Sequence, residues 1–90
     1  MQRHIQGFIW LDWVADKLET KHGVEPEEVE ETFFGGQTKV RKAASGKYLL
    51  YGKSSDGRCM FVVFSWVGQQ VKVITARDMT QSERLFYARK

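Results

Sequence analysis

The sequence predicts an α+β domain with two N-terminal helices, an antiparallel sheet of roughly four strands and a C-terminal helix. Apolar residues recur at helical spacing in the first third of the chain, whereas from residue 37 onward they alternate as in strands. The chain has 90 residues, which suffices for one hydrophobic core and is too short for a second. Residues 1–90 are therefore expected to form a single domain.

The first third of the chain is expected to contain two helices. Residues 8–11 are apolar and aromatic, and they indicate either a first strand or a packed lead-in to the first helix. Asp12 is a suitable N-cap for that helix, and Gly23 ends it by supplying a left-handed residue after the last turn. Pro26 suits the first position of the second helix, which the glycine pair at 35–36 closes.

The strand pattern begins after the second helix. Residues 60–64 are unbroken and apolar, which predicts a central strand buried on both faces, and the alternating cations of residues 38–42 indicate an edge strand. The Ser-Asp-Gly sequence at 55–57 suits a hairpin turn, and residues 68–69 form a second tight turn. The expected strands are residues 38–42, 47–52, 58–67 and 71–77.

A capping box marks the start of the final helix. Thr80 and Glu83 have the spacing at which each side chain satisfies the other's backbone N–H group. Glu83 is therefore assigned to the start of the helix rather than to chemistry. Leu85 and Phe86 continue this short helix.

Composition excludes several classes of protein. Cys59 is the only cysteine, which excludes an intrachain disulfide and a cysteine-rich zinc site and fits a reducing cytoplasm. The longest apolar run is too short to span a bilayer, and residues 1–7 lack the apolar core of a signal peptide. No phosphate-binding loop, dinucleotide fingerprint or histidine-rich metal pattern is present. We therefore expect a soluble cytoplasmic protein without membrane contact, cofactor or metal.

The net charge of +3 combines two oppositely charged parts. Residues 1–36 carry three cations against eight acids, a balance of −5, whereas residues 37–90 carry eleven cations against three acids, a balance of +8. A basic region of this size is typical of a protein that binds a polyanion such as RNA or DNA. The same cations could equally keep exposed strands soluble and protect a sheet edge, so charge alone leaves both interpretations open.

Three residues near the C-terminus form a first group of candidates for chemistry. Arg77 ends the last strand, and Arg84 and Tyr87 lie one turn apart on the final helix. The arginines could bind a phosphodiester, and Tyr87 could donate to a leaving oxygen or stack on a base. The alternative is a well-packed terminal hairpin with a solvated rim, in which Tyr87 is an aromatic residue packed on the sheet.

Three further candidates lie earlier in the chain. Lys53 and Arg58 flank the turn at residues 55–57, near one hairpin mouth, where Arg58 could bind a phosphate through its planar guanidinium group. His22 lies at a helix C-terminus, which stabilises a protonated imidazole that could donate its proton. Alternatively, Arg58 is a solvated arginine at a strand start, and His22 only caps or packs there.

Surplus aromatic residues suggest a protein partner. Aromatic side chains are enriched at interface anchors, so another protein could cover an apolar surface of the sheet or of a helix. The alternative is that a thin two-layer core uses all of them. The residues concerned are Trp13, Phe34, Tyr48, Tyr51 and Trp66.

Ordered motifs along nearly the whole chain carry a family resemblance. The first two are Phe8-x-Trp10 leading to Lys21-His22-Gly23-Val24, and the acidic segment from Glu28 to Phe33. The third is Lys47-Tyr48-Leu49-x-Tyr51-Gly52-Lys53-Ser54 with Gly57 and Arg58, and the fourth is Ile74-Thr75-Ala76-Arg77 followed by Met79-Thr80-x-x-Glu83-Arg84 and Tyr87. Together these motifs resemble the BrnT-like toxins, which are the ribonuclease members of type II toxin–antitoxin pairs.

The resemblance implies a RelE-like fold that cleaves RNA without a metal, through attack of the ribose 2′-hydroxyl on the adjacent phosphorus. It also implies a cognate antitoxin that neutralises the toxin and binds operator DNA, so that the toxin reaches DNA only through the antitoxin. The alternative is a non-catalytic RNA- or protein-binding module on the same scaffold. The site residues assigned for cleavage are Arg58, Arg77 and Arg84 on the phosphate, His22 or Lys53 as base, and Tyr87 as acid or stacking group.

Overall fold

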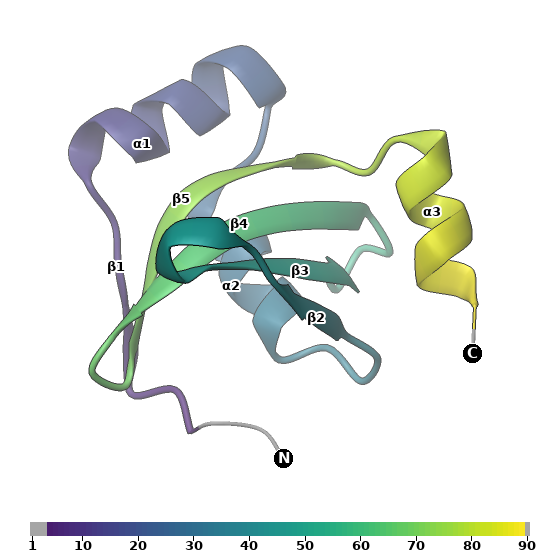
Figure 1. Ribbon diagram of the computed structural model, residues 1–90. Helices are drawn as coiled ribbons and strands as arrows, with labels where there is room; N and C mark the ends of the chain where they lie inside the picture. The colour runs from purple at the N-terminus through teal and green to yellow at the C-terminus, as the bar shows by residue number, and fades with distance from the viewer. Residues whose placement is uncertain (1–3, 90) are drawn as a thin grey trace.

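A five-stranded mixed sheet forms the centre of the molecule, with helices on both of its faces (Figure 1). The computed structural model describes residues 4–89, so Arg3 and Lys90, which enter the charge balance, lie outside the described residues. Within this range every helix is too short or too polar to traverse a bilayer. The elements are β1 (Gly7–Ile9), α1 (Asp12–Lys17), η1 (Leu18–His22), α2 (Pro26–Phe33), β2 (Lys39–Lys42), η2 (Ala44–Gly46), β3 (Lys47–Lys53), β4 (Cys59–Val67), β5 (Gln70–Asp78) and α3 (Gln81–Ala88).

The strands lie in the order β1-β5-β4-β3-β2. Strands β2 to β5 are antiparallel neighbours joined in sequence order, as expected. Strand β1 runs parallel to β5, with Gly7 opposite Gln70, and makes the sheet mixed. The α+β prediction is confirmed, with one strand more than the sequence indicated. Three residues are too few to show an alternating pattern, and their partner strand lies far along the chain.

The first helix starts differently from the prediction and ends as predicted. The Leu11 carbonyl accepts hydrogen bonds from the N–H groups of Val14 (2.9 Å) and Ala15 (3.1 Å), so Leu11 is the N-cap. Asp12 is instead the first helical residue, where its carboxylate still interacts favourably with the positive end of the helix dipole. After the π-helical turn η1, Gly23 ends the helix with a φ of 61°.

Helix α2 begins at Pro26, as predicted. The Glu28 carboxylate accepts a hydrogen bond from the Glu25 N–H group at 3.2 Å, which satisfies one of the free donors at the helix start. Val29 and Phe33 are buried, as their spacing indicated, whereas Phe34 directly after the helix is 66% exposed. The helix therefore packs one face on the sheet and leaves an aromatic ring in solvent at its end.

The hairpins place a buried strand inside the sheet and a basic strand at its edge. Strand β2 forms one edge of the sheet, which confirms the prediction for its alternating cations. On β4, Met60 and Phe61 point to opposite faces and both are buried, so the prediction of a strand buried on both faces is also confirmed. In the turn before β4, Gly57 has a φ of 84°, a conformation that favours glycine.

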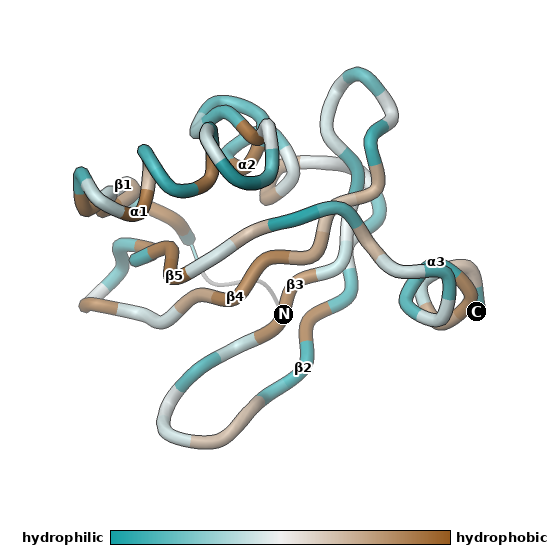
Figure 2. The backbone as a smooth tube through the Cα atoms, turned by 90° about the horizontal axis from the view of Figure 1, so that it is seen from above, coloured by the Kyte–Doolittle hydropathy of each residue, from teal (hydrophilic) through white to brown (hydrophobic). Residues whose placement is uncertain are grey.

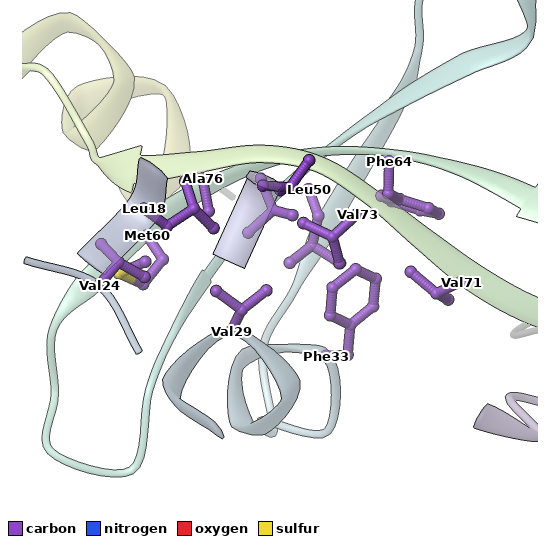
Figure 3. Close-up of a cluster of buried hydrophobic side chains, with 12 residues drawn as sticks. Leu18, Val24, Val29, Phe33, Leu50, Met60, Phe64, Val71, Val73 and Ala76 are labelled. Carbon is purple, nitrogen blue, oxygen red and sulfur yellow. The ribbon is translucent and has the colours of Figure 1, made fainter. Parts of the chain in front are cut away.

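Two clusters of buried side chains occupy the two faces of the sheet. The larger lies between the sheet and the N-terminal helices, and Figure 3 shows Val29 and Phe33 of α2 directed toward the strands. The smaller consists of Tyr51, Phe61 and Met79 and packs against α3. Figure 2 shows α1 and α2 together on one side of the sheet and α3 apart at its end.

The five aromatic residues that suggested a partner divide into two groups. Tyr51 is buried, and Tyr48 and Trp66 pack against the larger cluster. Trp13 on α1 is 63% exposed and Phe34 is 66% exposed. The core therefore uses three of these aromatic residues and leaves two large rings on the surface.

Candidate functional site

A surface pocket of about 610 Å³ lies where α3 meets the edge strand β2 and the β3–β4 hairpin. We call it the basic pocket, because four cationic side chains line it and none of its described lining residues is acidic. The side chains of Gln37, Thr38, Cys59 and Tyr87 also line it. The four cations are Lys39, Lys53, Arg84 and Arg89. A pocket of this composition attracts an anion such as a phosphodiester.

Two of these cations are available to a ligand. Lys53 ends β3 beside the hairpin turn, and Arg84 lies on α3 one turn before Tyr87. Both side chains are exposed, and neither donates a hydrogen bond to another residue within the described range 4–89. Both are therefore free to bind an anion without breaking an existing contact.

Tyr87 is held in place at the wall of the basic pocket. Its hydroxyl group donates a hydrogen bond of 2.6 Å to the carbonyl oxygen of Gln37. Burial raises the pKa of Tyr87 above its ordinary value, and Cys59 adds to this effect. The phenol therefore keeps its proton at neutral pH and can act as a hydrogen-bond or proton donor.

Lys39 is a residue of the basic pocket that sequence reasoning did not single out. Its Nζ atom donates a hydrogen bond of 2.8 Å to the Phe86 carbonyl and another to the Arg89 carbonyl, and it lies 4.8 Å from the centre of the Phe86 ring. The Arg41 guanidinium lies over the same ring at 5.1 Å. Lys39 thus caps the C-terminal end of α3, and Arg41 adds a cation–π contact to the same helix. The alternating cations of the predicted edge strand were the sequence signal for Lys39, but this pattern does not show which residues Lys39 contacts.

Arg58 lies outside the basic pocket and has all five of its N–H donors occupied. The carboxylate of Asp78 accepts two of them, at 2.6 and 3.1 Å, and the Glu28 carboxylate accepts one at 3.1 Å. The carbonyls of Gly23 and His22 accept the remaining two at 3.0 and 3.1 Å. Arg58 therefore clamps the end of η1 to the start of α2 and the end of β5, and a phosphate would have to displace a carboxylate to reach it.

The Arg58 clamp also holds the backbone of His22 and lowers the pKa of Asp78. The Arg58 guanidinium holds the pKa of Asp78 below its ordinary value, with smaller contributions from Arg84 and His22. His22 does not line the basic pocket. Arg84 connects the two regions, since it lines the pocket and is close enough for its charge to act on Asp78.

Arg77 is paired with the residue that the sequence assigned to the helix start. Its two terminal nitrogens donate to the two Glu83 oxygens at 2.8 and 2.9 Å, and its guanidinium lies 4.4 Å from the centre of the Phe61 ring. This contact lowers the pKa of Glu83. The predicted capping box is confirmed, because Glu83 and Thr80 also exchange hydrogen bonds of 2.8 and 3.2 Å. Glu83 therefore fixes α3 to the end of β5.

The six candidates from the sequence thus fall into three places. Lys53, Arg84 and Tyr87 come together in the basic pocket. Arg58 and His22 lie at the clamp, and Arg77 lies at the start of α3. Among residues 4–89, no three His, Cys, Asp or Glu side chains come together in a way that could hold a metal ion.

Comparison with known proteins agrees with the fold and with the motifs. The crystal structure of the ribonuclease toxin BrnT of Brucella abortus has a similar fold, with a TM-score of 0.70 and 22% sequence identity over 83% of this chain and 97% of that chain. No curated protein sequence matches the chain. Residues 10–83, most of the chain, match the sequence profile of the family described as the ribonuclease toxin, BrnT, of type II toxin–antitoxin systems. The resemblance in the ordered motifs is thereby confirmed, and the chain belongs to the BrnT family of ribonuclease toxins.

Proposed function

We propose that the chain is a metal-independent endoribonuclease toxin that cleaves RNA at the basic pocket. The observation that carries this proposal is the grouping of four cations and a protonated phenol around one pocket without an acidic lining residue. Membership of a family of ribonuclease toxins supplies the class of substrate. A phosphodiester is the part of RNA that this set of side chains fits best.

In the proposed reaction the ribose 2′-oxygen forms a bond to the adjacent phosphorus while the bond from phosphorus to the 5′-oxygen breaks. The products are a 2′,3′-cyclic phosphate and a 5′-hydroxyl end. Arg84 holds the phosphate and stabilises the negative charge that develops on its oxygens. Tyr87 donates a proton to the leaving 5′-oxygen.

The proton of the 2′-hydroxyl group needs an acceptor, for which the sequence indicated His22 or Lys53. Lys53 lines the basic pocket and His22 does not, so the geometry favours Lys53.

Cleavage of a labelled RNA by the purified protein, in the presence of a chelator, tests this proposal. The wild type should produce cyclic phosphate ends, and Arg84→Ala and Tyr87→Phe should each lower the rate about 100-fold. Lys17→Ala is the matched control, because it removes a cation from α1 and should leave the rate unchanged. An intact RNA pool with the wild type, together with normal growth of bacteria that express it, would refute the proposal.

A non-catalytic RNA-binding module is the second candidate function. One observation favours it: carboxylates already occupy Arg58 and Arg77, two of the three arginines expected on the phosphate. RNA affinity that falls steeply with salt, without any cleavage, would support this candidate over the first.

We also propose that a cognate antitoxin neutralises the protein in the cytoplasm and carries it to operator DNA. The exposed Trp13 of α1, on the opposite side of the sheet from α3, is the surface we assign to this partner. The product of the neighbouring gene should bind the wild type and bind Trp13→Ala at least tenfold more weakly. Equal affinity for the two proteins would exclude Trp13 from the interface.

A further inference from the structure

A second surface pocket, of about 820 Å³, adjoins the basic pocket. We call it the side pocket. The two pockets share four residues, which are Gly36, Gln37, Lys53 and Tyr87. A ligand whose phosphate lies in the basic pocket can therefore place its neighbouring group in the side pocket. In RNA, the group next to a phosphate is a ribose with its base.

Phe34 gives the side pocket an aromatic surface. The ring is 66% exposed, although the preceding residue, Phe33, is buried in the larger core cluster. Its edge contacts Phe8, with the ring centres 6.0 Å apart and an angle of 79° between the planes. The ring is thus supported from one side and open to solvent on the other. Proteins that recognise single-stranded RNA stack unpaired bases on aromatic rings of this kind.

Glu31 gives the side pocket an oriented hydrogen-bond acceptor. One of its oxygens, Oε1, accepts hydrogen bonds from the N–H group (3.2 Å) and the hydroxyl group (2.7 Å) of Ser55. These bonds hold the carboxylate against the β3–β4 hairpin. The other oxygen, Oε2, accepts no hydrogen bond from residues 4–89. A carboxylate oxygen accepts well from the amino group of a base, and it repels a phosphate.

From this arrangement we infer that the side pocket binds the base next to the cleaved phosphate and prefers a base that carries an amino group. Phe34 stacks on the base, and Glu31 accepts a hydrogen bond from the amino group. Adenine, cytosine and guanine have such a group, whereas uracil has none. The inference rests on the proposed function, since it deepens the description of the same substrate. Glu27, Glu30 and Glu31 line the side pocket and repel a phosphate, so the phosphate is expected in the basic pocket and the base in the side pocket.

Short oligonucleotides with a single cleavable ribose test the inference. All other riboses carry a 2′-O-methyl group, and the bases on either side of the cleavable bond are varied one at a time. At one of the two positions the wild type should cleave amino-bearing bases about tenfold faster than uracil. Replacement of guanine by hypoxanthine, which lacks the 2-amino group, shows whether that group is the one recognised.

Variants of the two side-pocket residues identify the source of the preference. Glu31→Gln should reduce the preference to about twofold or less, because an amide can also donate to the carbonyl oxygen of uracil. Phe34→Ala should raise KM for every base about tenfold, and Phe34→Trp should restore it. Trp13→Ala is the matched control, since it removes a ring of similar exposure (63%) from α1. It should change neither the base preference nor KM.

The outcomes separate this inference from the proposed function. Equal cleavage of all four bases, unaffected by Glu31→Gln and Phe34→Ala but abolished in Arg84→Ala, would overturn the inference and leave the ribonuclease. If no oligonucleotide is cleaved, the proposed function fails. Binding of fully 2′-O-methylated oligonucleotides, measured by fluorescence anisotropy, then decides the inference. Equal affinities for uracil and the amino-bearing bases would overturn it, whereas the same order of preference as above would support it.

Discussion

The two faces of the sheet are built differently. The face covered by α1, η1 and α2 holds a cluster of twelve buried residues, whereas the face covered by α3 holds three, Tyr51, Phe61 and Met79. No residue of α3 itself is buried. Apolar burial is the main source of stability, so the first face stabilises the fold, and the second carries the candidate site on a lightly packed helix.

The arginines show the same contrast. Arg58, next to the heavily packed face, uses every donor to join three elements. Arg84, on α3, donates no hydrogen bond to the rest of the described chain, residues 4–89. Two arginines of the same chain thus have opposite roles, one structural and one available to a ligand. A basic residue is a candidate for ligand binding only when its donors are free.

The largest expected effect comes from the core of the first face. Leu18 is fully buried on η1, so Leu18→Ala should lower the free energy of unfolding by about 2–5 kcal/mol. Phe86 on α3 is only partly buried, so Phe86→Ala should cost about 1–2 kcal/mol. Urea denaturation of both variants measures the difference. Equal losses would show that the two faces contribute alike to stability.

The clamp of Arg58 is expected to have the next largest effect. Arg58→Met keeps most of the aliphatic stem but leaves the carboxylates of Asp78 and Glu28 without their partner, and it should lower the free energy of unfolding by about 2 kcal/mol. Arg84→Met is the matched control and should change stability by less than about 0.5 kcal/mol. If Arg58→Met instead abolishes cleavage without loss of stability, Arg58 belongs to the site and not to the scaffold.

Acid should weaken the contacts that anchor α3. The pKa of Glu83 is lower in the folded protein than its ordinary value of about 4.5, because Arg77 stabilises the charged form. The stabilisation is therefore complete above the unfolded pKa and is lost as the pH falls through the folded pKa. The urea midpoint of the wild type should decrease below about pH 4.5.

Glu83→Gln provides the control for this pH dependence. It removes the carboxyl group that titrates, so its urea midpoint should be lower at neutral pH and fall less steeply in acid. Asp78, whose pKa is also lowered, keeps its own contribution in this variant. A pH profile parallel to that of the wild type would mean that Glu83 does not contribute.

The smallest expected effect concerns the other end of α3. Lys39→Met removes the cap on the Phe86 and Arg89 carbonyls and should cost about 0.5–1 kcal/mol. Amide hydrogens of α3 should then exchange about threefold faster than in the wild type, whereas those of β4 should not change. Lys39→Arg retains a cation and should restore the slower exchange. Faster exchange throughout the sheet would mean that Lys39 supports the whole fold.

Local signals in the sequence predicted most of the element boundaries. Gly23, Pro26 and the pair of Thr80 and Glu83 each act on backbone groups within a few residues, so their effect can be recognised without knowledge of the fold. The start of α1 shows the limit of this approach. Asp12 suits both the N-cap and the first helical position, and only the backbone of Leu11 decides between them.

Pairings over long distances could not be predicted. Arg58 and Asp78 are 20 residues apart, and nothing in either local sequence indicates that they meet. For the same reason the sequence could assign Arg58, Arg77 and Arg84 to the phosphate but could not show which of them already have partners. The grouping of Lys53, Arg84 and Tyr87 could be expected from where the predicted strands and the final helix lie. The contribution of Lys39 could not, because it depends on how the edge strand meets α3.

The parallel pairing of β1 with β5 has a consequence for the synthesis of the protein. Strand β1 leaves the ribosome before β5, yet its register, with Gly7 opposite Gln70, requires this later strand. Closure of so long a loop comes late in folding. Strand β5 also precedes α3, which carries Arg84 and Tyr87. The basic pocket is therefore assembled only after α3 has been translated, and a partner that binds α1, as we propose for the antitoxin, can engage the nascent protein before the pocket exists.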